Sequence, residues 1–189
     1  MVSDATVIDD MRRWLERAVI GLNLCPFAKA VHTKGLIHYA VSAATDTEAL
    51  RQDLIYELNA LLAQDPSARD TTLLIAPYVL VDFWDYNDFL GVADKLLRKM
   101  KLQGTVQIAS FHPDFQFGGT DADDITNYTN RAPYPCLHLL REASIDRAVA
   151  AFPDAEMIFE RNMRTLEELG QGGWGALGVG KSPDEDPQK

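Results

Sequence analysis

The sequence predicts an α/β fold, with a small mixed or parallel sheet of at least three strands that about five helices cover. Apolar residues recur every three or four positions in several long segments, which is typical of amphipathic helices. Short, continuous apolar runs lie between these segments, as in strands buried on both faces. Because the two kinds of segment alternate along the chain, helices packed on a sheet are favoured. The alternative is an α+β sandwich with an extra strand near residues 115–117.

The N-terminal third predicts two helices with a strand between them. Residues 3–23 carry apolar side chains at helical spacing, with Ser3 or Asp4 available as the N-cap. Residues 36–42 are rich in β-prone side chains and predict the first strand. A capping-box pattern followed by an apolar stripe predicts the second helix, over residues 45–64.

The middle of the chain predicts two more strands that flank a third helix. The apolar run at residues 72–76 predicts a buried strand, residues 85–101 a helix, and residues 105–111 the third strand. Residues 112–135 show no period and are rich in Asp, Asn, Thr, Gly and Pro, so we expect a loop. A loop of that length in a compact domain indicates either function or undetected structure.

The C-terminal part predicts two further helices and then a tail. Apolar spacing favours a fourth helix over residues 137–149 and a fifth over residues 153–169, which Gly170 ends. We therefore expect residues 1–170 to form a single α/β domain and residues 171–189 to be a Gly-rich, acidic, flexible tail.

The net charge limits the classes of partner. A formal charge of −10 and a pI near 4.7 disfavour nucleic acid and anionic membranes, because both attract clustered Lys and Arg. No run approaches the roughly 18 apolar residues that a membrane span needs, and the N-terminus shows no leader, so we expect a cytoplasmic protein. In that compartment Cys25 and Cys136 are expected to be free thiols.

Residues 175–182 match the nucleotide-binding pattern G-x-x-x-x-G-K-[ST] at every fixed position. A phosphate-binding loop needs a strand before it and a helix after it. Here a predicted helix precedes the pattern and a proline-rich acidic stretch follows, so we interpret the match as coincidental.

Cys25 is the first candidate catalytic residue. If it caps the short helix that Pro26 opens, backbone amides and the nearby Lys29 would favour a nucleophilic thiolate. The alternative is a small buried hydrophobic residue, which free cysteines usually are.

His112 is the second candidate, because it follows the third predicted strand. The carboxyl ends of strands border the ligand crevice in open α/β sheets, so this imidazole is a candidate acid/base, with Asp114 to orient it. The alternative is a histidine that bonds only to its own loop. No H-x-x-x-H or C-x-x-C spacing supports a metal site.

The third group consists of candidate ligand-binding residues, namely Asn130, Arg131, His138 and Arg141. In the predicted fourth helix, His138, Arg141 and Glu142 would share one face, and the two arginines could clamp a carboxylate or phosphate. The alternative is a set of arginine contacts that holds the long loop against the domain. A further acidic and aromatic turn, which contains Asp82, Trp84 and Asp85, could hold a cation or simply begin a helix.

Four segments carry a family resemblance: LNLCPFA at 22–28, SFHP at 110–113, NRAPYP at 130–135 and LHLLRE at 137–142. Over about residues 7–170 the chain resembles a bacterial family, the domain of unknown function fourteen-fifteen. The resemblance implies a bacterial cytosolic protein, and it implies no particular reaction, cofactor or catalytic residue.

Two functions are compatible with these residues. The first is a small-molecule enzyme acting on an anionic metabolite, with His112 as acid/base, Cys25 as nucleophile and Arg131 with Arg141 as the anion holder. The second is a non-catalytic module that binds an anionic ligand or regulates in response to it. The sequence specifies neither a cofactor nor an oligomeric state.

Overall fold

A mixed sheet of four strands forms the centre of the molecule. The computed structural model describes residues 2–152 and 154–183. The strands are β1 (Ile37–Val41), β2 (Thr71–Ile75), β3 (Val106–Phe111) and β4 (Cys136–Arg141), in the order β1-β2-β4-β3. β1 and β2 are parallel, whereas β4 runs antiparallel to both of its neighbours. The predicted α/β class with a mixed sheet is therefore confirmed.

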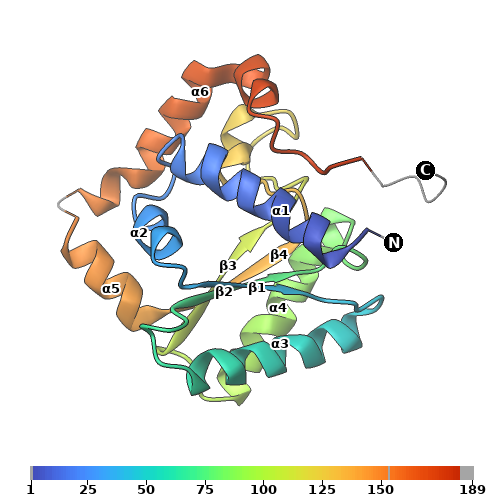
Figure 1. Cartoon of the computed structure of the whole chain (residues 1–189). Helices are drawn as coiled ribbons and strands as arrows, with labels where there is room; N and C mark the ends of the chain where they lie inside the picture. Colours follow the sequence, from blue (N-terminus) through green and yellow to red (C-terminus); the bar gives the residue numbers. More distant parts are fainter. Residues whose placement is uncertain (1, 153, 184–189) are drawn as a thin grey trace.

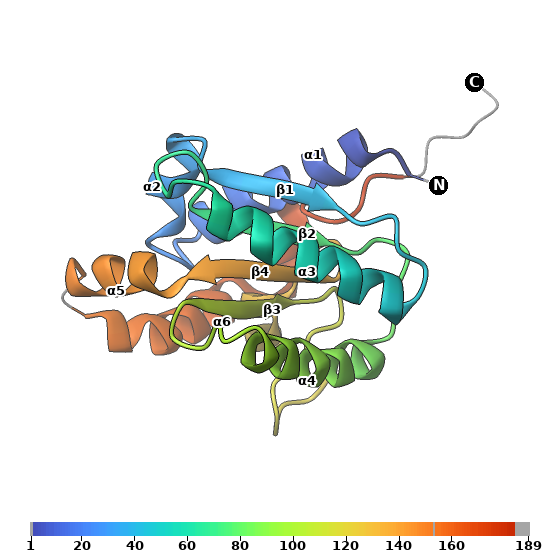
Figure 2. The same ribbon diagram turned by 90° about the horizontal axis from the view of Figure 1, so that it is seen from below.

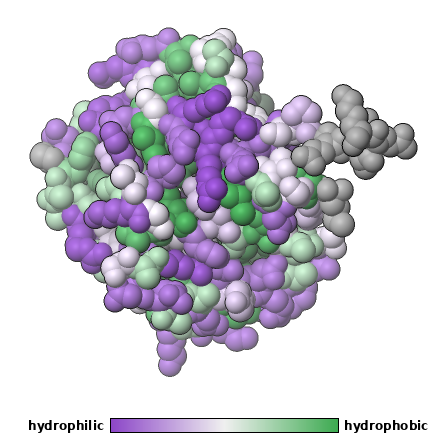
Figure 3. Space-filling view, in the orientation of Figure 1, coloured by the Kyte–Doolittle hydropathy of each residue, from purple (hydrophilic) through white to green (hydrophobic). Residues whose placement is uncertain are grey.

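Helices cover both faces of this sheet. α1 (Asp4–Trp14), which continues as the π-helix η1 (Leu15–Ile20), and α2 (Ala28–Thr33) lie on one face, and α3 (Thr47–Ala63) and α4 (Phe83–Lys99) lie on the other (Figures 1 and 2). The remaining helical segments are η2 (Ile125–Asn130), α5 (Glu142–Ala150), η3 (Ala155–Met157) and α6 (Ile158–Ala176). Figure 3 shows hydrophilic residues over the middle of the face that α1 crosses, with smaller hydrophobic groups beside them.

Side-chain caps fix where the predicted helices begin. The Ser3 hydroxyl accepts a hydrogen bond from the Thr6 N–H at 3.1 Å, as one of the two expected caps of the first helix. The Asp46 carboxylate, rather than the first residue of the predicted capping box, accepts from the Ala49 N–H at 2.8 Å. Each cap satisfies an amide that has no partner within the helix.

Two hydrophobic cores hold the layers together, one on each face of the sheet. Alternation along the strands sends successive side chains into opposite cores. The core under α3 and α4 includes Leu50, Leu54, Leu58, Leu61, Leu74, Leu137 and Leu139. The core under α1 includes Val7, Met11, Trp14, Leu73, Ile75, Cys136 and Val179. Fully burying one such aliphatic side chain contributes about 2 kcal/mol.

The prediction of a fourth helix from residue 137 was wrong, because residues 136–141 form β4. Leu137 and Leu139 face one core while Cys136 faces the other, which is the period-two pattern of a strand. The same leucines also fit the apolar stripe of a helix, so the sequence pattern does not distinguish the two structures. Pairing with β2 on one side and β3 on the other makes these residues a strand. The helix begins at Glu142 instead, as α5.

The long segment before β4 contains structure that the sequence pattern did not indicate. Residues 112–135 are expected to be a loop, but Ile125–Asn130 form the 3-10 helix η2. The Asp124 carboxylate accepts from the Thr126 N–H at 2.8 Å and caps it. Within the described chain, residues 115–117 form no strand, so the α+β alternative lacks its extra strand.

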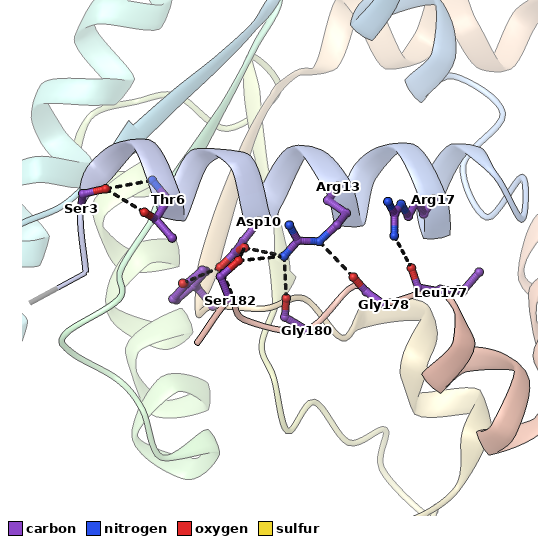
Figure 4. A network of polar contacts seen from close by, with 10 residues as sticks. Ser3, Thr6, Asp10, Arg13, Arg17, Leu177, Gly178, Gly180 and Ser182 are labelled. Carbon is purple, nitrogen blue, oxygen red and sulfur yellow. Dashed lines mark hydrogen bonds and ion pairs between the residues drawn. The ribbon is translucent and has the colours of Figure 1, made fainter. Parts of the chain in front are cut away.

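The expected boundary of the domain at residue 170 also changes. Gly170 leaves the helical conformation, with φ of 64°, but a second helical stretch continues α6 to Ala176. The chain then lies along α1, where Arg13 Nε donates to the Gly178 carbonyl at 2.9 Å and Arg17 Nη1 donates to the Leu177 carbonyl at 3.0 Å (Figure 4). The described part of the predicted tail is therefore packed on the domain, and residues 184–189 lie outside the described residues.

Asp10 is the buried centre of this contact. Its carboxylate has no solvent exposure and accepts hydrogen bonds from the Tyr134 hydroxyl at 2.9 Å, the Ser182 N–H at 2.9 Å and the Ser182 hydroxyl at 2.6 Å (Figure 4). Arg13 donates to it as well, at 2.5 Å. Burial alone would raise the Asp10 pKa, but these hydrogen bonds together lower it below its usual 3.8. Ser182, the last residue of the nucleotide-binding pattern, is thus bonded to a carboxylate.

We expect Asp10→Ala to destabilise the fold by about 3 kcal/mol, because it leaves buried donors unpaired. Since the folded pKa is depressed, the stabilisation by Asp10 is fully present above pH 3.8 and is lost as the pH falls through the lower folded pKa. Urea unfolding of both proteins at several pH values measures the difference. Asp9→Ala, which removes only an exposed ion pair to Arg12, is the matched control and should change stability by less than about 0.5 kcal/mol. Equal effects of the two substitutions would contradict the role of Asp10.

Candidate functional site

The chain order predicts a ligand crevice at the carboxyl ends of β2 and β3, but the segment that enters β4 fills this edge. The Ala76 N–H donates to the Pro135 carbonyl at 2.9 Å, and the His112 N–H donates to the Asn130 carbonyl at 3.2 Å. Because β4 lies between β2 and β3, the chain that leads into it must cross the edge where the crevice would open.

Cys25 lies between η1 and α2, partly buried against the core under α1. Burial raises the pKa of its thiol, although the backbone N–H groups of Phe27 and Ala28 act in the opposite direction. The cap of α2 is Phe27 and not Cys25. These surroundings favour the neutral thiol over the thiolate. They agree with the alternative interpretation of Cys25 as a small buried hydrophobic residue.

His112 is completely buried at the end of β3. Its Nδ1 accepts from the Asp114 N–H at 3.0 Å, and its Nε2 lies 3.0 Å from the Leu80 carbonyl. A carbonyl can only accept, so this geometry requires the neutral tautomer that carries its proton on Nε2. Burial lowers the His112 pKa. Both ring nitrogens are therefore used within the protein.

Asn130 and Arg131 hold the long loop in place. Asn130 Nδ2 donates to the Ser110 carbonyl at 3.0 Å. Arg131 donates from Nε to the Phe115 carbonyl at 3.1 Å and from Nη2 to the Ala122 carbonyl at 2.6 Å. Its guanidinium also lies 4.3 Å from the centre of the Tyr128 ring. This arrangement matches the predicted alternative, in which the arginine ties the loop to the domain.

His138 and Arg141 point to opposite faces of the sheet, because they are three residues apart on β4 rather than on a helix. His138 Nε2 lies 2.5 Å from the Thr71 hydroxyl, and burial lowers the His138 pKa to about 4. Arg141 donates to the carbonyls of Leu61 and Gln64, at 2.5 and 2.7 Å, where α3 ends. The predicted shared face with Glu142 is therefore wrong.

The structure thus does not gather the predicted residues into one cavity. Cys25 and His138 lie on the α1 side of the sheet, and Arg141 lies on the α3 side. Arg131 is bonded within the loop that follows β3, and His112 bonds both to this loop and to the Leu80 carbonyl after β2.

A different pocket opens at the opposite edge of the sheet, where β1 and β2 begin. It has a volume of about 320 Å³ and is lined by Gly35, Leu36, Ile37, His38, Gln64, Ala68 and Arg69. Arg141 lies next to this pocket, because its guanidinium also donates a hydrogen bond to the Arg69 carbonyl at 3.3 Å. Arg141, a predicted site residue, thus contacts Gln64 and Arg69, which line this pocket.

Arg69 is the cation of this pocket, and other side chains hold it in position. Its Nε donates to the Thr72 hydroxyl at 2.9 Å, and its Nη2 pairs with the Glu57 carboxylate on α3. Glu57 is only 8% exposed, so the pair is largely removed from water. Across residues 2–152 and 154–183, no hydrogen bond from Nη1 of Arg69 is found. The two N–H groups of Nη1 are therefore donors that none of the described residues uses.

His38 lines the same pocket from β1, 3.9 Å from Glu57. Burial lowers the His38 pKa and the charge of Arg69 lowers it further, against the opposing effect of Glu57. With its side chain 46% exposed, His38 presents a neutral imidazole to the pocket near pH 7.

The sequence contains one signal for this pocket. Glu57 occupies the apolar stripe of α3, between Leu54 and Leu61, where a charged side chain must be paired. His38 and Arg69 carry no comparable signal, because their approach depends on how the strands pair.

A second hollow, of about 390 Å³, lies between α4 and the edge strand β3. Its charged lining residues are Asp94 and Glu142, and no Lys or Arg lines it. It is therefore a poorer site for an anion than the pocket at Arg69. In the part of the chain that the structure describes, no three His, Cys, Asp or Glu side chains converge as a metal site would require, and no helix could cross a membrane.

The model of the family DUF1415, described as a protein of unknown function, matches residues 6–176. The chain belongs to this family. The match extends beyond the predicted boundary to the end of α6, and the resemblance is confirmed at the level of the family. No curated protein and no solved structure matches the chain. For this DUF1415 member, the candidate site therefore rests on the geometry around Arg69, His38 and Glu57.

We expect the thiols of the folded protein to react slowly with a disulfide reagent at neutral pH, because burial raises the pKa of both Cys25 and Cys136. Both should react rapidly once the chain is unfolded in denaturant. Counting the released chromophore in the wild type and in Cys25→Ser measures this. If one thiol of the folded wild type reacts rapidly and the Cys25→Ser variant lacks this reaction, the result would support Cys25 as a nucleophile instead.

The depressed pKa of His138 predicts a pH-dependent loss of stability. The unfolded imidazole protonates near pH 6.5 and the folded one near pH 4, so stability should fall by about 3 kcal/mol as the pH decreases across this interval. Urea unfolding of the wild type and of His138→Gln, which keeps a polar partner for Thr71, isolates the effect, since His38 and His112 are present in both. A parallel pH dependence in the two proteins would contradict it.

Proposed function

We propose that this DUF1415 domain binds a small anionic metabolite in the pocket between β1 and the end of α3, with Arg69 as the anion-binding residue. The observation that carries the proposal is the fixed guanidinium of Arg69, a residue that lines a pocket of about 320 Å³ and whose Nη1 makes no hydrogen bond within the described part of the chain. A cytoplasmic location is part of the proposal, as expected from the sequence.

The chemistry of the pocket favours a carboxylate or a phosphate. Both present charged oxygen atoms that can accept hydrogen bonds from the Nη1 N–H groups of Arg69. Because Glu57 and Thr72 already orient Arg69, little conformational entropy is lost when a ligand binds. The volume lies at the lower end of the range for small-molecule pockets, which favours a small metabolite.

A non-catalytic binding or regulatory domain is the better supported function. The enzyme that the sequence suggested needs a reactive Cys25 and a free His112, and burial raises the pKa of the first while backbone groups occupy both nitrogens of the second. One observation favours acid/base catalysis as a second candidate, namely the neutral imidazole of His38 beside Glu57 in the same pocket. Consumption of a bound ligand by the wild type but not by His38→Gln would support catalysis.

A thermal-shift titration with phosphate and with small mono- and dicarboxylates tests the binding proposal. A ligand at 100 times its dissociation constant stabilises the folded state by about 2.7 kcal/mol. The expected result is a rise in Tm with at least one of these anions. His38→Ala should weaken the shift and still fold, because His38 is half-exposed, and Arg69→Lys should weaken it while keeping a cation beside Glu57.

Arg98→Gln is the matched control, since Arg98 is an exposed arginine on α4 with an ion pair to Asp94. It should leave the anion-induced shift unchanged. A shift that survives in His38→Ala and Arg69→Lys, or no shift with any of the anions, would contradict the proposal.

A further inference from the structure

A continuous row of aromatic rings runs across the surface from the start of α4 to the start of α6. We call this row the aromatic ridge, and it consists of Trp84, Phe83, Phe115, Phe117 and Phe159. Neighbouring rings along it have centroid separations of 5.0–6.0 Å. Because each ring contacts the next, the ridge is one contiguous feature although three distant segments of the chain build it.

Both ends of the ridge are exposed to solvent. The Trp84 side chain is 68% exposed and Phe159 is 55% exposed. Val81 beside Trp84 is 61% exposed, and Met157 beside Phe159 is 41% exposed. Large apolar side chains gathered in this way at the surface mark interaction sites more often than isolated ones do.

The backbone that presents Trp84 is held in a disfavoured conformation. Leu80 has φ of 58°, in the left-handed region that residues other than glycine rarely adopt. The buried imidazole of His112 bonds to the Leu80 carbonyl and stabilises this bend. Leu80 therefore points into the core while Val81, the next residue, points out. The His112 ring also lies 5.4 Å from the Phe83 ring, measured between centroids, so it contacts the ridge directly.

The charge near the ridge is mainly negative, although the Arg131 guanidinium bonds to the Phe115 carbonyl and Arg161 follows Glu160 in the chain. The three segments that carry the ridge, residues 81–88, 113–117 and 156–160, contain six carboxylates and no Lys or Arg. Asp82 and Asp114 both lie close enough to His112 to influence its titration, so they flank the region where Phe83 meets Phe115. Asp82 also caps α4 through the Trp84 N–H at 2.8 Å.

We propose that the aromatic ridge binds a basic segment of a partner protein, whose apolar side chains cover Trp84 and whose Lys or Arg side chains meet the surrounding carboxylates. Complementary charge favours this occupant and accelerates its association. A second copy of the chain is disfavoured, because it would bring the same six carboxylates opposite the first set. An anionic lipid surface is disfavoured for the same reason.

The probe for this interaction is a synthetic peptide of about twelve residues that alternates Lys and Leu, which exceeds the roughly seven residues that an extended segment needs to follow the ridge. A matched peptide with Glu in place of Lys is the charge control. Binding is measured by calorimetry at low and moderate ionic strength. The expected result is that the Lys peptide binds, that added salt weakens it, and that the Glu peptide does not bind.

Two variants of the protein locate the site. Trp84→Ala keeps the net charge and should weaken binding of the Lys peptide by about tenfold or more, as for an aromatic anchor in an interface. Asp85→Asn combined with Asp114→Asn should weaken it by about tenfold through lost charge, with the Asp82 cap left intact. Tyr56→Ala, at a side chain 70% exposed on α3, is the matched control and should have no effect.

Several outcomes would overturn the proposal. They are a Lys peptide that does not bind, equal binding by Trp84→Ala and the wild type, and equal binding of the Glu peptide. If the protein binds vesicles of anionic phospholipid and Trp84→Ala abolishes this binding, the ridge is a membrane site instead. If analytical ultracentrifugation shows self-association that Trp84→Ala abolishes, the ridge binds a second copy instead. Loss of the anion-induced thermal shift at Arg69 leaves this test unaffected, because the pocket and the ridge share no residue.

Discussion

The position of β4 between β2 and β3 is the constraint on which the rest of the structure depends. As an antiparallel strand in the middle of the sheet, β4 is buried on both faces and links the two cores through Cys136 on one side and Leu137 on the other. The chain that enters it crosses the carboxyl edge of the sheet and fills the crevice that a simple parallel arrangement would leave there. The open pocket lies instead at the other edge, where β1 and β2 begin.

A second theme is the use of polar side chains to satisfy backbone carbonyls. Arg131, Arg141 and His112 all bond to main-chain oxygen atoms, in a loop, at the end of α3 and at a strained bend. Such contacts stabilise irregular backbone whose carbonyl groups have no hydrogen-bond partner in a helix or a sheet. They also explain why functional residue types in distinctive motifs are not, by themselves, a site. Arg69 differs because it lines a pocket and because, among the described residues, nothing accepts a hydrogen bond from its Nη1.

The pocket and the aromatic ridge give the domain two separate surfaces with different chemistry. The pocket offers a fixed cation and a neutral imidazole near the amino ends of β1 and β2. The ridge follows the carboxyl ends of β2 and β3 and is apolar with an acidic border. His112 connects the buried sheet to the ridge, since its bond to Leu80 fixes the turn that exposes Val81.

The sequence by itself determined the fold class, three of the four strands, the first three long helices and the family, because periodicity and caps are local properties of the chain. The sequence also indicated that residues 175–182 are not a phosphate-binding loop, because no strand is predicted before them and no helix after them. Only the tertiary structure decided that residues 136–141 are a strand, since the same leucines satisfy both periods and strand pairing chooses between them. It likewise decided the candidate site, because the approach of His38, Glu57 and Arg69 depends on the register of β1 with β2 and on the packing of α3, which no local pattern specifies.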